Sequence, residues 1–311
     1  MKKLLGHHHI SMYAKNAKET NTFYEKVLGL RRVKMTVNQD DPTMYHLFYG
    51  DRTGIAGSAL TFFEMPFLGS TYQGTNAITR IGLVLSSKES FAYWEDRLQQ
   101  YGIPFTESSY ANRKALHIKD KDGLALSLQL EPGANIEGWE AWAESDIPEA
   151  YQIKGIGTVE IKVRRLHKFT RTLTEGLGYQ LNDRKDGVHL FSLEQHGIFS
   201  EILAVELDGP RERQGRGAIH HLALRVREKE ELVYWQEKIR SRGFQTTEII
   251  DRFYFQCFYF RESNGIMFEL ATDGPGFTVD CPVESLGQKL ELPPFLEKHR
   301  KEIESQLTPL S

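Results

Sequence analysis

A strand, a helix and three further strands recur four times along this chain of 311 residues. The first copy opens on an alternating apolar pattern over residues 6–14, which is typical of a strand with one buried face. Apolar residues at helical spacing follow, and Gly29 ends that helix. A unit that returns at a spacing of roughly seventy residues indicates an internally duplicated fold, whose copies bury their apolar faces against one another.

The repeat predicts six segments. They are βαβββ modules over residues 6–64, 75–130, 155–205 and 217–272, a linker over 131–152, and a C-terminal helical tail over 282–311. Within the tail, Pro293 and Pro294 favour a helix start, and the helix is expected to run from Phe295 to Leu307. The closing strand of the third module is expected to begin at Gly197. The fold class that follows is α+β.

Composition excludes several classes of protein. The chain is 40% hydrophobic and 26% charged, with a net charge of −3, which are ordinary values for a soluble globular protein. The charges are interspersed, so neither a nucleic-acid footprint nor a basic membrane surface is expected. Cys257 and Cys281 are too few for a disulfide framework, and reduced thiols in the cytoplasm are the simpler interpretation. No apolar stretch approaches the length of a membrane span.

Alignment of the four modules brings particular side chains to equivalent places. At the start of the first strand the modules carry His8-His9, Thr79-Arg80, Gly157-Thr158 and His220-His221. On the last strand they carry Thr61, Ser127, Glu201 and Glu269. Only the first and fourth modules therefore carry histidine at the first-strand position. Glu201 occupies the last-strand position of the third module. Thr158 and Arg80 occupy the histidine positions of the third and second modules, so Glu201 is expected to form an ion pair with an arginine and not to bind metal.

His9, His221 and Glu269 make a set of two histidines and one carboxylate. Such a facial triad holds a divalent metal on one side and is diagnostic of non-haem Fe(II) oxygenases. The alternatives are polar surface histidines, an expression-tag remnant at the N-terminus, and a salt bridge between Glu269 and an arginine. Because the two histidine pairs share one register, the metal site is favoured, with Fe(II) as the expected metal and Mn(II) as the second choice. The ligands require modules 1 and 4 to share one barrel-like half, and modules 2 and 3 then form the other.

The chain resembles the vicinal oxygen chelate superfamily, which contains glyoxalases, bleomycin resistance proteins and extradiol dioxygenases. Phe23-Tyr24 through Val27-Leu28-Gly29-Leu30 is similar to the superfamily's FY…VLG signature. More narrowly, the chain resembles the ring-cleaving dioxygenases of the hydroquinone type. The segments that carry this likeness are residues 6–11, 45–51, 60–63, 219–221, 265–269, 286–290 and 292–297.

The resemblance implies a role for each residue around the triad. It selects His9 and His221 as the ligands within their pairs, and it leaves His8 and His220 as groups that could accept a proton from a phenol. It also places Arg252 and Tyr259 at the substrate pocket as hydrogen-bond donors to an oxyanion. From the residues alone, Tyr259 could simply pack, and Arg252 could pair with Asp251 or Glu248. A third histidine, His7, departs from the usual pair and leaves the register at this end open.

The expected activity is that of an Fe(II)-dependent extradiol-type dioxygenase, which acts on hydroquinones or catechols and places both atoms of O₂ in the product. The expected partners are a small aromatic diphenol and O₂, with no nucleic acid and no membrane, and with a homo-oligomer left open. One alternative is a non-catalytic binding or resistance protein for electrophilic aromatics, which needs no complete metal triad. A glyoxalase-like isomerase would usually supply a second carboxylate, and Thr61 stands at that place.

Overall fold

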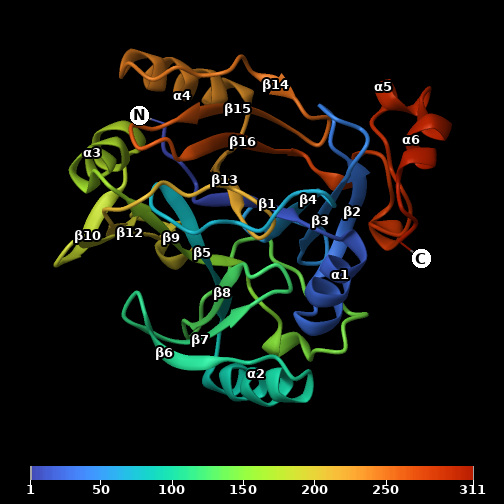
Figure 1. Ribbon diagram of the computed structural model, residues 1–311, viewed down its shortest axis with the longest axis horizontal. Coiled ribbons are helices and arrows are strands. Elements are labelled where there is room, and N and C mark those ends of the chain that lie inside the picture. The colour runs from blue at the N-terminus through green and yellow to red at the C-terminus, as the bar shows by residue number, and fades with distance from the viewer. Residues whose placement is uncertain (1, 311) are drawn as a thin grey trace.

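The computed structural model describes residues 2–310 and contains two curled eight-stranded sheets (Figure 1). The first sheet has the strand order β14-β15-β16-β13-β1-β4-β3-β2, and the second has the order β10-β11-β12-β9-β5-β8-β7-β6. Strands from the two ends of the chain thus share one sheet, and the middle of the chain supplies the other. The predicted α+β fold of four βαβββ modules in two barrel-like halves is confirmed.

The strands have the following bounds. The first sheet comprises β1 (His7–Ala14), β2 (Arg31–Val37), β3 (Tyr45–Gly50), β4 (Ala59–Glu64), β13 (Ile219–Val226), β14 (Ile250–Asp251), β15 (Phe255–Arg261) and β16 (Met267–Pro275). The second comprises β5 (Ala77–Leu85), β6 (Thr106–Tyr110), β7 (Arg113–Lys119), β8 (Ala125–Leu130), β9 (Ile156–Val163), β10 (Gln180–Lys185), β11 (Val188–Ser192) and β12 (Ile202–Glu206). In each half, two modules meet through one antiparallel pair of first strands, β1 with β13 and β5 with β9.

Each module contributes one helix to the outside of its half (Figure 1). The helices are α1 (Ala17–Asn21) with its π-helical continuation η1 (Thr22–Val27), α2 (Lys88–Gln100), α3 (Leu166–Arg171) with its π-helical continuation η3 (Thr172–Leu177), and α4 (Lys229–Ser241). Ser87 caps α2 through a hydrogen bond from the backbone N–H of Ser90, as its place before the apolar pattern predicts. Among the described residues, no helix is long and apolar enough to cross a membrane.

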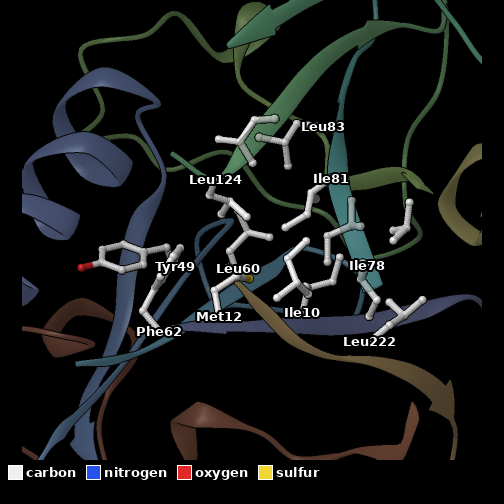
Figure 2. Packing of buried hydrophobic residues seen from close by; sticks show 14 of the residues in the cluster. Ile10, Met12, Tyr49, Leu60, Phe62, Ile78, Ile81, Leu83, Leu124 and Leu222 are labelled. Carbon is white, nitrogen blue, oxygen red and sulfur yellow. The ribbon is translucent and has the colours of Figure 1, made fainter. Parts of the chain in front are cut away.

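The two halves share one apolar core (Figure 2). Ile10 and Met12 of β1 point into this core, where Ile10 lies beside Ile78 and Ile81 of β5. All four side chains are almost fully buried. This packing holds the Ile10 and Met12 face of β1 in place, and it thereby fixes the other face of the strand, which carries His9.

Two predicted elements differ from the structure. The tail helix is broken into α5 (Pro294–Glu297) and α6 (Arg300–Gln306), which lie beside β2 (Figure 1). The last strand of module 3 begins at Ile202 rather than Gly197, because residues 197–200 form a tight 3₁₀ turn. In that turn the hydroxyl of Ser200 donates to the carbonyl of Gly197, which favours the turn over an extended chain.

Candidate metal centre

Three ligand atoms converge on the inner face of the first sheet. Nε2 of His9 lies 3.3 Å from Nε2 of His221 and 3.4 Å from Oε2 of Glu269. Nε2 of His221 lies 2.8 Å from the same carboxylate oxygen. The three residues come from β1, β13 and β16, neighbouring strands that bring residues from opposite ends of the chain together.

These residues fit a divalent metal ion. Metal–ligand bonds of about 2.1 Å set neighbouring ligand atoms about 3.0–3.4 Å apart for angles between a right angle and the tetrahedral angle. Glu269 is 0% exposed, and neither of its carboxylate oxygens accepts a well-oriented hydrogen bond from the described residues. A buried carboxylate without a compensating partner is costly, and a cation between the three ligand atoms removes that cost. Three protein ligands leave the other positions open to further ligands.

A β-bulge in each strand gives each histidine pair its arrangement. The ladder between β1 and β13 shifts register between His7 and His9, and it shifts again opposite His220. An extra residue in a strand re-aims the neighbouring side chains. Each bulge therefore lets two consecutive histidines contact each other instead of pointing to opposite faces of the sheet.

Each candidate ligand is hydrogen-bonded through its other ring nitrogen to the histidine before it. Nδ1 of His9 lies 2.8 Å from Nδ1 of His8, and Nδ1 of His221 lies 2.9 Å from Nδ1 of His220. An imidazole that binds metal through Nε2 carries its hydrogen on Nδ1 and donates it. His8 and His220 then accept at Nδ1 and carry their own hydrogen on Nε2. For His8 that hydrogen is donated to the carbonyl of Thr272, 3.0 Å away.

Burial favours the neutral form of the imidazoles of His8, His220 and His221. It lowers the pKa of His8 and of His220 to about 3, with a further contribution from the adjacent histidine in each case. Burial also lowers the pKa of His221, although the charge of Glu269 opposes that effect. Burial alone would raise the pKa of Glu269, but the two neighbouring imidazoles bring it well below its usual range. Neutral imidazole and ionised carboxylate are the forms that bind metal.

A cavity of about 550 Å³ opens over the three ligand atoms. Of the four further residues predicted for this site, His220, Arg252 and Tyr259 line the cavity. His8 is not among the residues that line it; His8 lines a separate cavity of about 320 Å³ and contacts the candidate ligand His9. The role of His8 in proton transfer stays a prediction.

The third histidine, His7, points elsewhere. Its Nε2 donates to the backbone carbonyl of Glu201 in the other half, at 3.2 Å, and its side chain is buried. The register that the sequence left open is thus settled: His7 connects the two halves, whereas His8 and His9 belong to the candidate site.

Arg252 has a different partner from those that the sequence suggested. Its Nη1 and Nη2 donate to the two carboxylate oxygens of Asp40, at 3.0 and 2.8 Å. Asp40 lies in the loop between β2 and β3, far away in the sequence, so that neither Asp251 nor Glu248 is its partner. Gln39 from the same loop donates to the backbone carbonyl of Arg252, at 2.8 Å. The first and fourth modules therefore meet across the mouth of the cavity.

Sequence reasoning missed His46, a half-buried residue of β3 that lines the cavity. Its Nε2 lies 2.9 Å from the hydroxyl of Thr61, and its ring stacks on Phe63 with 4.1 Å between ring centres. Burial and the neighbouring histidines lower its pKa well below the usual value. The available signal was the alternation of His46 and Phe48 on a strand of the histidine-bearing module, which puts both on the inner face.

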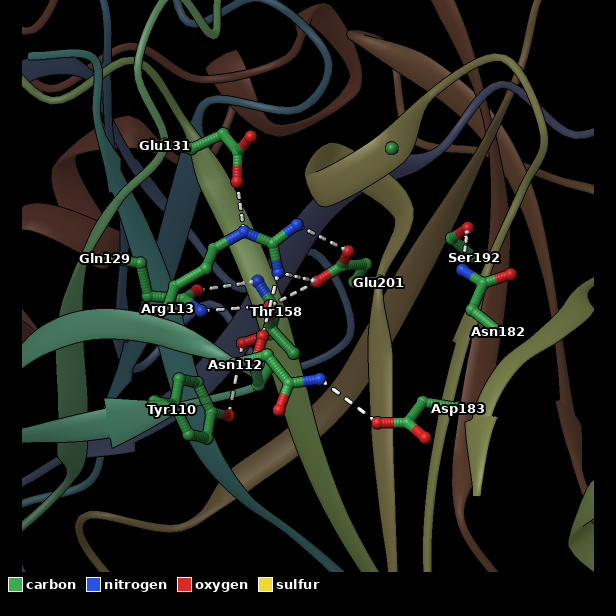
Figure 3. A network of polar contacts seen from close by, with 12 residues as sticks. Tyr110, Asn112, Arg113, Gln129, Glu131, Thr158, Asn182, Asp183, Ser192 and Glu201 are labelled. Carbon is green, nitrogen blue, oxygen red and sulfur yellow. Dashed lines mark hydrogen bonds and ion pairs between the residues drawn. The ribbon is translucent and has the colours of Figure 1, made fainter. Parts of the chain in front are cut away.

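The second half contains an ion pair instead (Figure 3). Arg113 donates through Nη1 and Nη2 to the two carboxylate oxygens of Glu201, at 2.8 and 2.9 Å, and its Nε contacts Glu131. The hydroxyl of Thr158 also donates to Glu201, at 2.7 Å. The expected ion pair of Glu201 is present, but its arginine is Arg113 of β7 rather than Arg80.

The strand ladders also correct the alignment of Glu201. In the other three modules the equivalent last-strand residues are Thr61, Ser127 and Glu269. Each of them pairs with the first-strand residue that lies two positions after the histidine place. In module 3 the residue two beyond Thr158 is Glu160, and it pairs with Leu203. Glu201 therefore lies two residues before the position of Glu269, and the second half has no carboxylate at the metal-ligand place.

Comparison with known proteins agrees with this architecture. The model of the Glyoxalase/Bleomycin resistance protein/Dioxygenase superfamily matches residues 6–128 and 155–270, and the chain belongs to that superfamily. It is 42% identical to the "Putative ring-cleaving dioxygenase MhqA" of Bacillus subtilis (strain 168), over 99% of both chains. It is 24% identical to the chlorohydroquinone/hydroquinone 1,2-dioxygenase of Sphingobium indicum, over 96% of this chain and 94% of that protein.

Solved structures extend the comparison. A crystal structure from Bacillus subtilis subsp. subtilis str. 168 superposes with a TM-score of 0.93 at 32% identity, over 100% of this chain and 99% of the other. Glyoxalase I from Zea mays superposes with a TM-score of 0.62 at 13% identity, over 88% of this chain and 93% of the other. The second likeness shows the shared fold alone.

Proposed function

We propose that this protein is an Fe(II)-dependent ring-cleaving dioxygenase of the extradiol type that acts on hydroquinones or catechols. The observation that carries the proposal is the convergence of His9, His221 and Glu269 at the buried end of a cavity. The names of the relatives support the same class of reaction. Mn(II) is the alternative metal for this set of nitrogen and oxygen ligands.

His9, His221 and Glu269 would hold the metal, which when bound supplies Lewis acidity toward a phenol oxygen and a site for O₂. The protein residues fix its position. The Nδ1 contacts from His8 and His220 orient the two imidazoles, and the apolar core behind β1 prevents that strand from shifting. Burial of all three ligands excludes bulk water from the reacting centre.

We assign His220 a hydrogen-bond donor role toward a substrate oxygen. Its Nδ1 accepts from His221, so its Nε2–H is the group available in the cavity. To accept a proton at Nε2 instead, His220 would have to leave the metal ligand His221 without its Nδ1 hydrogen, which is unfavourable. This replaces the general-base role predicted from the sequence. A donor aimed at developing negative charge in a buried site stabilises the transition state.

Arg252 and Tyr259 complete the surroundings of the substrate oxygens. Asp40 takes up one hydrogen on each Nη of Arg252, so the Nε–H and the second hydrogen of each Nη remain for a substrate oxygen. Burial, together with the charge of Glu269, raises the pKa of Tyr259 well above its usual value, so its hydroxyl stays protonated and can donate. The ring of Tyr259 lies edge-on to His221, with 5.5 Å between ring centres, close to the candidate metal.

Anaerobic purification, metal analysis and oxygen uptake on a panel of hydroquinones and catechols test the proposal. We expect about one iron per chain, stoichiometric oxygen consumption and a yellow ring-opened acid that carries label from both atoms of ¹⁸O₂. Iron-loaded protein that binds diphenols or their thiol adducts tightly but consumes no oxygen would contradict the proposal, and would favour a binding or resistance protein.

A further inference from the structure

The cavity over the metal ligands is much larger than a single aromatic ring requires. A closed apolar cavity of about 150 Å³ accommodates benzene. The cavity here is about 550 Å³, more than three times that size. A bare diphenol bound at the metal would leave most of this volume to water.

The surplus volume has an apolar wall. On β4 the inward-facing residues Thr61 and Phe63 lead outward from the metal, and Met65 follows directly after the strand. Strand residues of one face are spaced about 6.6 Å apart, so Phe63 lies one step and Met65 about two steps outward from Thr61. Val37, Met44 and Ile250 line the same cavity. Methionine side chains adapt to irregular apolar shapes, which suits substituents of more than one form.

The charges around the cavity disfavour an anionic substituent. Among the described residues that line it, Arg252 is the one cationic side chain, against the carboxylates of Asp40, Asp41 and Glu269. Arg252 is already paired through both Nη atoms with Asp40. A divalent metal brings the formal charge of the lining to zero. An added carboxylate would therefore meet no free cation and would lie near Asp41 at the mouth.

We propose that the preferred substrates are uncharged diphenols with a bulky apolar ring substituent, which the wall formed by Phe63, Met65, Val37, Met44 and Ile250 accommodates. This inference rests on the proposed ring-cleaving function and specifies its substrate class. Phe63 and Met65 are then specificity-determining residues, because they contact the ring substituent.

A substrate series tests the proposal in the iron-loaded protein. It comprises hydroquinone, methylhydroquinone, tert-butylhydroquinone, phenylhydroquinone and the anionic 2,5-dihydroxybenzoate. Burying one methyl-sized group is worth roughly fourfold. We expect kcat/KM for the tert-butyl and phenyl compounds to exceed that of hydroquinone on the order of tenfold or more, with the carboxylate below hydroquinone. Anaerobic calorimetry provides a readout without turnover, and the apolar compounds should bind with a more negative heat-capacity change.

One substitution tests the wall directly. Met65→Lys places a cation among the apolar residues, so the ratio of kcat/KM for phenylhydroquinone to that for hydroquinone should fall several-fold and the carboxylate should gain. Leu181→Lys is the matched control, because Leu181 is exposed on the edge strand β10 of the other half. It should leave all ratios unchanged.

The outcomes separate the two claims. Turnover of hydroquinone without any gain from apolar substituents overturns the substrate class and leaves the ring-cleaving function standing. A preference for 2,5-dihydroxybenzoate that Arg261→Ala abolishes also overturns it, and would place a carboxylate in the neighbouring cavity lined by Arg211 and Arg261. No oxygen uptake with any diphenol overturns the proposed function and this inference together.

Discussion

The two halves of the molecule differ in what compensates the charge of a buried carboxylate. Each contains a carboxylate that is nearly inaccessible to solvent, Glu269 in the first half and Glu201 in the second. In the second half Arg113 binds Glu201 through two hydrogen bonds. In the first half Glu269 faces the imidazoles of His9 and His221 and, among the described residues, pairs with no arginine or lysine. The protein itself supplies the positive charge in the second half, and we propose that a metal ion supplies it in the first half.

The backbone does not explain this difference. Bulges interrupt the pairing of first strands in both halves, at His8 and His220 in one and at Thr79 in the other. The positions for a metal site are thus available twice, and the side chains decide which half uses them. A shared fold accordingly predicts the geometry of a site but not its chemistry.

Removing a ligand from the first half should have the largest effect. His9→Ala, His221→Ala and Glu269→Ala should each abolish both metal binding and oxygen uptake, because two protein ligands hold a divalent metal poorly. Metal content by mass spectrometry and circular dichroism of the fold provide the measurements. Glu201→Ala is the matched control and should retain iron. Loss of iron from that variant, with retention in Glu269→Ala, would mean that the assignment of the halves is reversed.

The donor role of His220 is tested by a pair of substitutions. His220→Ala should keep iron but lower kcat by about 10²–10³, the usual cost of losing one donor to an oxyanion. His220→Gln can still donate a hydrogen bond and should recover part of this loss. Equal loss of activity in the Ala and Gln variants would instead support a general base, since glutamine cannot accept the proton.

The ion pair of the second half should matter for stability and not for turnover. Glu201→Gln leaves Arg113 partly buried beside Glu131 alone, so the free energy of unfolding should fall by about 3 kcal/mol, the low end of the range for a broken buried pair. Urea denaturation measures this change. Unaltered stability, or a drop in kcat at full iron loading, would show that the two halves are not independent in function.

A third carboxylate, Glu212, lies in the segment that crosses between the halves, and it faces neither an arginine nor the candidate metal site. No ion pair or hydrogen bond holds its carboxylate among the described residues, and burial raises its pKa to about 7. The folded protein therefore binds more protons than the unfolded chain between about pH 4.5 and 7, and stability should fall as the pH rises through that window. Glu212→Gln should remove this slope and stabilise the protein at pH 8 by about 2 kcal/mol, with allowance for partial exposure. Denaturation at pH 5 and at pH 8 checks the sign, and an unchanged slope would contradict it.

Local patterns predicted the modules well because each depends on residues close in sequence. The alternation around Ile10 and the cap at Ser87 are of this kind. Contacts between modules were less accessible. The pairing of Arg252 with Asp40, and the position of His46 beside Thr61, depend on how strands from distant parts of the chain lie in one sheet.

The bulges explain the remaining errors around the site. Strict alternation would place His8 and His9 on opposite faces of β1, and no sequence pattern marks the extra residue that turns them toward each other. A shift of two residues in module 3 likewise moved Glu201 away from its predicted place. Such shifts are set by the pairing of strands and not by the composition of either strand.

We infer that one half of this duplicated fold binds metal and the other does not. Anomalous X-ray scattering at the iron edge, from crystals of the iron-loaded protein, tests it directly. We expect a single peak per chain, about 2.0–2.2 Å from Nε2 of His9, Nε2 of His221 and a carboxylate oxygen of Glu269. A peak beside Glu201 and Thr158, or no peak between the two histidines and Glu269, would contradict it.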